Sequence, residues 1–144
     1  MKFVVIFLLA LGPLAVQAQK SAVFVTDSVA VRGYDVVAYF TDSSAVKGTA
    51  QYKHWWMESW WYFASQEHLT SFKTNPEKYA PQYGGYCAYG TADGHKAPTQ
   101  PDAWTITDGK LYLNYNKKVM ELWRKDQPGF IEKADKNWPL LKHN

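Results

Sequence analysis

The feature that most constrains the fold of this chain is the placement of its aromatic residues. The sequence holds 7 Trp, 10 Tyr and 7 Phe among 144 residues. Many of them fall in two runs, residues 52–56 and 60–63, which are separated by the short segment Met57-Glu58-Ser59. Aromatic side chains favour β-strands, and two such runs joined by a short link predict a β-hairpin. We therefore expect the chain to fold around an aromatic-rich antiparallel sheet.

A second hairpin is predicted further along the chain. Residues 104–107 and 110–115 flank Asp108-Gly109, the dipeptide that a type I′ turn favours. Between the hairpins, Ser65 is expected to cap a short helix that carries Glu67 in its first turn. Asn75-Pro76 then starts another short helical turn, with proline at the first helical position.

The C-terminal part of the sequence predicts two helices. Asn116 is expected to cap the first, and Pro128-Gly129 to end it. The second carries its apolar residues at 130, 131, 134 and 138 and is expected to stop at Pro139. Strands and helices do not alternate regularly, which indicates an α+β fold. It would combine a small antiparallel sheet of aromatic-rich hairpins, a central short helix and two C-terminal helices.

The sequence pattern does not decide the secondary structure of two segments. Residues 34–40 are too apolar for a loop, but their spacing fits either a buried strand or a short helix. Residues 21–31 alternate loosely and fit either an edge strand or an ordered arm.

The first residues have the pattern of a secretory signal peptide. Lys2 precedes an uncharged run over residues 3–16, and Val16-Gln17-Ala18 places small residues at the two positions that a signal peptidase reads. A transmembrane anchor is the alternative, but the run is short and Gly12-Pro13 interrupts it. We expect a signal peptide over residues 1–18 and a single domain over residues 19–144. The domain would be exported, periplasmic or extracellular, with no stable membrane anchor after cleavage.

Composition excludes several classes of function. A single cysteine excludes an internal disulfide framework and a multi-cysteine zinc site within one chain. The net charge is +3 and the basic residues are scattered, so no nucleic-acid groove is predicted. The motifs of serine hydrolases, zinc proteases and P-loop proteins are absent from the sequence. The four tryptophans at 55, 56, 60 and 61 are expected in the core and on the sheet faces rather than around a ligand.

Four side chains could carry chemistry, and each also has a structural explanation. Cys87 follows a glycine pair, where bare backbone allows close approach, but cysteine is often only a small buried hydrophobe. His68 lies near a helix N-terminus, which favours the neutral imidazole that metals bind, and it could equally be a half-buried histidine bonded to backbone. His95 lies in a loop near Cys87 in sequence and could point into water. Asp35 lies in an apolar run and could be a turn anchor that accepts backbone N–H groups.

The sequence resembles the YHS-domain proteins, and in particular their exported single-domain branch. The resemblance covers nearly the whole chain after residue 18. It rests on residues 33–40 (GYDVVAYF), 61–65 (WYFAS), 67–69 (EHL), Phe72, 75–79 (NPEKY), 80–88 (APQYGGYCA), 104–106 (WTI) and 111–115 (LYLNY).

The resemblance implies a small α+β module similar to treble-clef-like metal-binding domains. It also implies that the cysteines of metal-binding members are replaced here by Ala38, Ala64 and His68, so that a multi-thiolate site cannot form.

The first functional hypothesis is a binding module rather than an enzyme. It would hold copper or zinc through Cys87 and His68, with His95 as a possible third ligand. The second hypothesis is a metal-free structural or small-ligand-binding domain in which Cys87 is buried. A third is a thiol-dependent enzyme with Cys87 as the nucleophile. The expected partner is thus a metal ion or a small ligand.

Overall fold

A computed structural model describes residues 12–13 and 20–144. The predicted cleavage site after Ala18 lies outside the described residues. The elements in chain order are β1 (Val25–Thr26), β2 (Val29–Ala30), η1 (Val31–Gly33), α1 (Ala38–Thr41), β3 (Thr49–Trp56), β4 (Ser59–Phe63), α2 (Gln66–Thr74), α3 (Pro76–Tyr79), η2 (Gln82–Gly85), α4 (Ala88–Ala92), β5 (Trp104–Thr107), β6 (Lys110–Leu113), α5 (Lys117–Arg124) and α6 (Gln127–Leu141).

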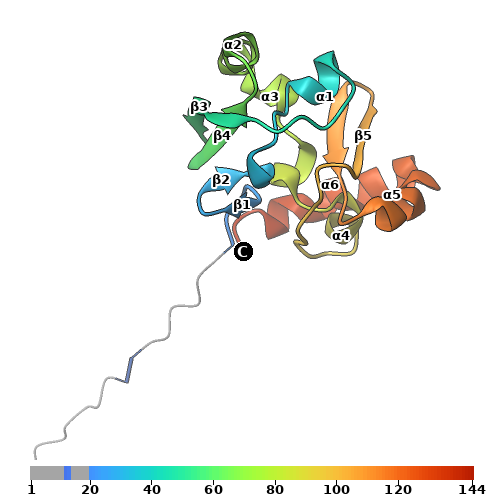
Figure 1. The fold of residues 1–144 in the computed structure, drawn as a ribbon. Coiled ribbons are helices and arrows are strands. Elements are labelled where there is room, and N and C mark those ends of the chain that lie inside the picture. The colour runs from blue at the N-terminus through green and yellow to red at the C-terminus, as the bar shows by residue number, and fades with distance from the viewer. Residues whose placement is uncertain (1–11, 14–19) are drawn as a thin grey trace, which may run out of the picture.

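The predicted α+β class and both predicted hairpins are confirmed, but the hairpins lie in separate sheets. A four-stranded sheet has the order β1-β2-β4-β3, and β5 and β6 form a two-stranded sheet (Figure 1). The larger sheet is not purely antiparallel, because β2 runs parallel to β4, with Val29 opposite Trp60. Residues 21–31 thus contribute strands. Within residues 34–40 the helical alternative holds from Ala38 onward, where α1 begins.

The predicted helix starts are confirmed in atomic detail. The Ser65 side chain accepts a hydrogen bond from the His68 backbone N–H at 3.1 Å, and the Asn116 side chain accepts one from Val119 N–H at 2.8 Å. Pro76 opens α3. Each cap satisfies a backbone donor that the helix itself cannot pair.

The prolines near the C-terminus have different roles from those predicted. Pro128 lies in the first turn of α6 rather than ending α5, because Asp126 caps α6 by accepting a hydrogen bond from Gly129 N–H at 3.1 Å. Proline is favoured there, since the first helical N–H groups need no intrahelical partner. Pro139 does not stop α6, which continues to Leu141. The Lys142 N–H still donates to the Trp138 carbonyl at 2.8 Å, so the last turn closes beyond the proline.

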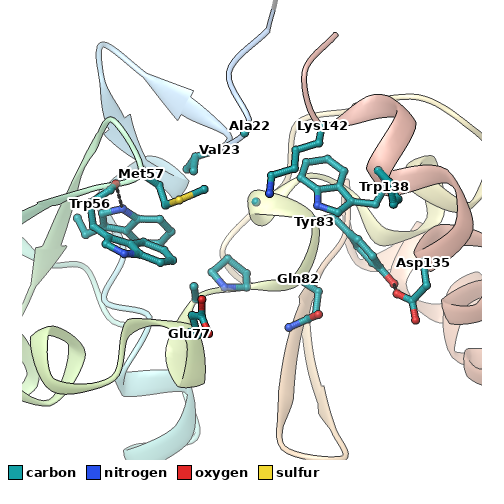
Figure 2. A pocket seen from close by; sticks show the side chains of 15 residues that line it. Ala22, Val23, Trp56, Met57, Glu77, Gln82, Tyr83, Asp135, Trp138 and Lys142 are labelled. Atoms are coloured by element: carbon teal, nitrogen blue, oxygen red, sulfur yellow. Dashed lines mark hydrogen bonds between the residues drawn. The ribbon is translucent and has the colours of Figure 1, made fainter.

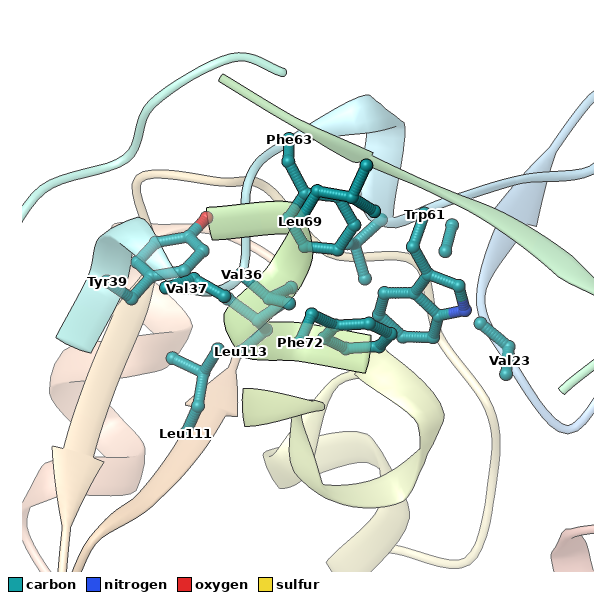
Figure 3. Close-up of a cluster of buried hydrophobic side chains, with 12 residues drawn as sticks. Val23, Val36, Val37, Tyr39, Trp61, Phe63, Leu69, Phe72, Leu111 and Leu113 are labelled. Atoms are coloured by element: carbon teal, nitrogen blue, oxygen red, sulfur yellow. The ribbon is translucent and has the colours of Figure 1, made fainter. Parts of the chain in front are cut away.

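The main core is a continuous cluster that connects the two sheets. Its centre is Phe72 of α2, fully buried, which stacks on Trp61 at a ring distance of 5.2 Å and packs on Phe63 at 5.0 Å. Leu111 and Leu113 of β6 belong to the same cluster (Figure 3). Of the two aromatic runs noted in the sequence, Trp61 and Phe63 belong to this core, and Tyr52 and Trp56 pack against it.

Strand β6 takes part in a second cluster as well. Side chains alternate across a strand, so Tyr112 points away from Leu111 and Leu113. It packs on Trp123 of α5 at a ring distance of 5.1 Å, in a group that includes Ala134 of α6. The C-terminal helices thus pack against the opposite face of β6 and against α4.

Both ends of the described chain meet at one buried lysine. The Lys96 ammonium donates to the backbone oxygens of Ser21 and Lys142 at 3.3 and 3.1 Å, and to those of Lys20 and Asn144 at 3.3 and 3.0 Å. It also lies 5.3 Å from the centre of the Tyr86 ring, within cation–π range. No helix in the described part of the chain is long and apolar enough to cross a membrane.

We expect Phe72→Ala to lower the free energy of unfolding by about 3–5 kcal/mol, because truncation of this buried phenylalanine leaves a cavity among Trp56, Trp61 and Phe63. Urea unfolding followed by circular dichroism measures this change. Leu140→Ala on α6 is the control, since Leu140 is 75% exposed, and it should shift the free energy by less than about 0.5 kcal/mol. Equal effects of the two substitutions would contradict this description of the core.

Candidate functional site

The Asp35 carboxylate is fully buried and binds four hydrogen-bond donors. Its Oδ1 accepts from the backbone N–H groups of Val37 at 2.9 Å and Ala38 at 3.2 Å. Its Oδ2 accepts from Ala64 N–H at 2.9 Å and lies 2.6 Å from His68 Nδ1. A buried carboxylate is stable only when it is paired and hydrogen-bonded in this way. The sequence interpretation of Asp35 as a turn anchor is confirmed, and the bonds to Ala64 and His68 add a long-range role.

The three positions at which metal-binding family members are expected to carry cysteines lie around this carboxylate. Ala38, Ala64 and His68 each place a nitrogen on the Asp35 carboxylate, so the three positions are neighbours in space. Of these three side chains, only the His68 imidazole could ligate a metal. Its Nδ1 is already held by Asp35, and its Nε2 lies 3.3 Å from Thr41 Oγ1.

The His68 and Thr41 contact has the order of a carboxylate–imidazole–hydroxyl triad. The shorter partner of the Thr41 hydroxyl, however, is Asp42 Oδ1 at 2.9 Å. A hydroxyl has one proton to donate, and the shorter contact directs it to the carboxylate rather than to the imidazole. The arrangement fits a structural link between α1 and α2 better than an activated nucleophile.

Cys87 lies in a separate, buried environment. Its thiol is 2% exposed and caps α4, where Sγ accepts from Gly90 N–H at 3.4 Å and from Tyr115 N–H at 3.3 Å, and donates to Asn114 Oδ1 at 3.4 Å. Burial raises the pKa of the Cys87 thiol, and the backbone donors oppose this only in part. The thiol is therefore kept protonated and out of contact with solvent.

No hydrogen bond among the described residues joins the predicted metal ligands to one another. Cys87 and His68 share no hydrogen-bond partner, and the His95 side chain is 57% exposed with its Nδ1 3.6 Å from Asp93. In the part of the chain that the structure describes, no group of three or more His, Cys, Asp or Glu side chains could hold a metal ion. The donor set around His68 therefore does not fit a metal centre of the kind the family implies. A site on Cys87, His68 and His95 stays a prediction.

The structure instead forms a cleft of about 440 Å³ between the large sheet and α6. Figure 2 shows Trp56 and Met57, at the tip of the β3–β4 hairpin, on one side and Trp138 and Tyr83 on the other. Fifteen residues line it: Ala22, Val23, Trp56, Met57, Trp61, Glu77, Ala80, Pro81, Gln82, Tyr83, Gly84, Asp135, Trp138, Pro139 and Lys142. A cleft of this size with mainly apolar walls and a few polar groups is typical of small-molecule sites.

The backbone beside the cleft depends on Gly84. This residue has a φ of +64°, and a Cβ atom there would collide with the carbonyl oxygen of Ala22. The Gly84 carbonyl in turn accepts from Phe24 N–H at 2.8 Å. The glycine pair singled out in the sequence thus lets the N-terminal segment pack against η2 and form part of the cleft wall.

The Tyr83 hydroxyl is a polar group of the cleft whose protonation state follows from its surroundings. The Tyr83 hydroxyl donates to Asp135 Oδ1 at 2.9 Å. Burial raises the pKa of Tyr83, and the bond to Asp135 raises it further, so the phenol stays neutral and remains a donor. Asp135 Oδ2 has no hydrogen-bond partner among the described residues, and Asp135 is exposed.

The sequence interpretation missed this cleft. Trp61 does lie in the core as expected, but Trp56 is only half-buried and lines the cleft. Trp138 was recognised only as an apolar helix position. No local pattern connects residues so far apart along the chain, although an excess of aromatic residues over what the core needs was the available signal.

Comparison with known proteins identifies one part of the chain. Residues 37–83 match the family model of the YHS domain. No curated protein and no solved structure matches the chain. Eight of the fifteen cleft residues fall inside the matched segment, and the other seven come from the N-terminal segment, Gly84 and the α6 region.

We expect Asp35→Ala to lower the free energy of unfolding by about 3–5 kcal/mol, because it leaves three buried N–H groups and an imidazole without their acceptor. Urea unfolding of the variant measures the loss. Asp42→Ala on the exposed end of α1 is the matched control and should cost less than about 1 kcal/mol. A small effect of Asp35→Ala would show that the carboxylate does not hold these elements together.

We expect the Cys87 thiol to resist iodoacetamide in the folded protein at about pH 8 and to react fully in denaturant. The physical reason is twofold, since burial excludes the reagent and raises the pKa of the thiol. Mass spectrometry over a time course measures the reaction. Rapid alkylation of the folded protein would contradict this assignment and favour a thiol-dependent enzyme.

Proposed function

The chain belongs to the YHS-domain family through residues 37–83, and on that premise we propose that it is an exported, metal-independent module that binds a small organic molecule in the aromatic cleft. The observation that carries this proposal is the position of the cleft at the junction of the YHS segment with the α6 region. Export is proposed from the signal-like pattern of residues 1–18.

The chemistry of the cleft supports binding of an organic ligand rather than a metal. Its walls carry the rings of Trp56, Trp138 and Tyr83, which offer a large apolar contact area at a small cost in side-chain entropy. His68 is the one histidine at the three family positions. It bonds to Asp35, whose carboxylate already accepts four hydrogen bonds from the protein itself. The family suggests a metal-related module, whereas in this chain the three family positions are joined by hydrogen bonds to the buried Asp35 carboxylate.

We further propose that the protein acts by binding rather than by catalysis. The thiol that could serve as a nucleophile is buried and protonated, and the Thr41 hydroxyl is directed to Asp42. The expected partner is thus a small molecule, with no metal cofactor required.

We expect a neutral aromatic probe, benzyl alcohol, to bind in the cleft. In ¹⁵N-correlated spectra of the purified protein, the indole N–H signals of Trp56 and Trp138 should shift with the probe. Those of Trp55 and Trp104, which lie outside the cleft, should stay in place. Trp55 is a strict control, because it is 48% exposed and reports non-specific stacking. Trp138→Ala should weaken binding by about tenfold, as expected for a central aromatic contact.

Two outcomes would overturn this proposal. One is an equal shift of all exposed tryptophans, which would mean that no cleft site exists. The other is stoichiometric binding of Cu(I) or Zn(II) that is lost in both Cys87→Ala and His68→Ala while each variant stays folded. That result would restore the metal hypothesis. Chelator-treated protein that binds the probe unchanged supports a metal-independent site.

A further inference from the structure

The charged side chains of the cleft are separated along its length. Figure 2 shows Lys142 entering at one end, and Glu77 with Gln82 standing at the other. Asp135 lies on the wall beside Tyr83, which fixes one of its oxygens. A ligand that spans the cleft therefore meets a cation at one end and carboxylates toward the other.

The positive end is held in place by the backbone. The Lys142 N–H donates to the Trp138 carbonyl at 2.8 Å, and the Lys142 carbonyl accepts from the buried Lys96 ammonium at 3.1 Å. The Lys142 ammonium itself has no salt-bridge partner among the described residues. A cation on an anchored backbone with a free head group is suited to bind a carboxylate.

The middle of the cleft is apolar. Trp56 and Met57 face Trp138 across it, and Val23 and Pro81 complete the lining. The volume of about 440 Å³ falls toward the small end of the range for ligand sites, which favours a molecule smaller than a typical drug.

We propose that the cleft selects a small zwitterion of the chemical class of an ω-amino acid, in which an apolar body separates the carboxylate from the ammonium. The carboxylate of the ligand binds Lys142, its ammonium binds Asp135 with Glu77 nearby, and its apolar part lies between Trp56 and Trp138. This inference rests on the proposed function and adds the chemical class of the ligand.

Ligands with a single charge fit less well, for a clear electrostatic reason. An apolar amine satisfies Asp135 and the aromatic faces but leaves Lys142 without an anionic partner. An apolar carboxylate satisfies Lys142 and meets the repulsion of Glu77 and Asp135. Only a ligand with both charges pairs each end of the cleft with its opposite.

The test compares four probes that share one aromatic ring: 3-[4-(aminomethyl)phenyl]propionate, which carries its two charges at opposite ends of the ring, phenethylamine, 3-phenylpropionate and benzyl alcohol. Their affinities for the purified protein are measured from the shifts of the Trp56 and Trp138 indole signals. The zwitterionic probe should bind about tenfold more tightly than either singly charged probe, as expected when one further charge-assisted hydrogen bond forms.

Variants assign the two charges separately. Lys142→Met should reduce the affinity for the zwitterionic probe to that for phenethylamine, and Asp135→Asn should reduce it to that for 3-phenylpropionate. Asn at position 135 keeps an oxygen that can accept from the Tyr83 hydroxyl, so the wall stays intact. Lys136→Met and Glu132→Gln on the same helix are the matched controls, because this exposed pair lies outside the cleft, and both should leave the affinity unchanged.

The outcomes separate this inference from the function on which it rests. Equal affinities for all four probes, or a preference for a singly charged probe, overturn the zwitterion while leaving the cleft as a ligand site. A preference that survives both Lys142→Met and Asp135→Asn also overturns it. Failure of every probe to bind overturns the inference and the proposed function together.

Discussion

The arrangement of the elements within residues 37–83, the segment that matches the YHS domain, depends on one buried carboxylate. Asp35 fixes the start of α1 through two backbone N–H groups, the end of β4 through Ala64 and helix α2 through His68. A carboxylate at full burial is costly without partners, so these elements are stable together only in the arrangement that supplies all four donors. A metal ion held by thiolates performs a comparable task in other small domains, since it connects short elements that have too little core to fix one another. Here hydrogen bonds to an anion replace metal–ligand bonds, and the aromatic core around Phe72 adds the burial that a small domain needs.

A second constraint joins the parts outside the YHS segment. Lys96 is 8% exposed and donates to backbone oxygens from both ends of the described chain. Burial lowers the pKa of Lys96, and the nearby Lys20 lowers it further. The backbone acceptors compensate in part for the loss of water around the ammonium. Ala22 and Val23 follow the N-terminal acceptors in the chain, and Lys142 is one of the C-terminal ones. The lysine therefore positions two walls of the cleft without touching the space between them.

The helix caps and turns could be predicted from the sequence, but the contacts between residues far apart in the chain could not. Ser65, Asn116 and Asp108-Gly109 act through residues within a few positions of themselves, and the structure confirms each. Pro128 was misinterpreted because proline fits either just after a helix or in its first turn, and only the Asp126 cap decides between them. The pairing of Asp35 with His68 and the approach of Trp138 to Trp56 arise from tertiary packing. No periodicity encodes such contacts, so the cleft became visible only with the fold.

Cys87 does not line the cleft but supports a helix that packs against one of its walls. Cys87 caps α4, and the carbonyls of Thr91 and Ala92 at the end of that helix accept from Asn137 Nδ2 of α6 at 3.0 and 3.1 Å. Helix α6 presents Asp135 and Trp138 to the cleft, so α4 and α6 connect position 87 to the proposed ligand site. Loss of binding in a Cys87 variant is therefore no evidence that sulfur contacts the ligand or a metal. The two explanations differ in what else changes, because a structural role lowers the free energy of unfolding together with affinity, whereas a ligating thiol lowers affinity in a protein of unchanged stability.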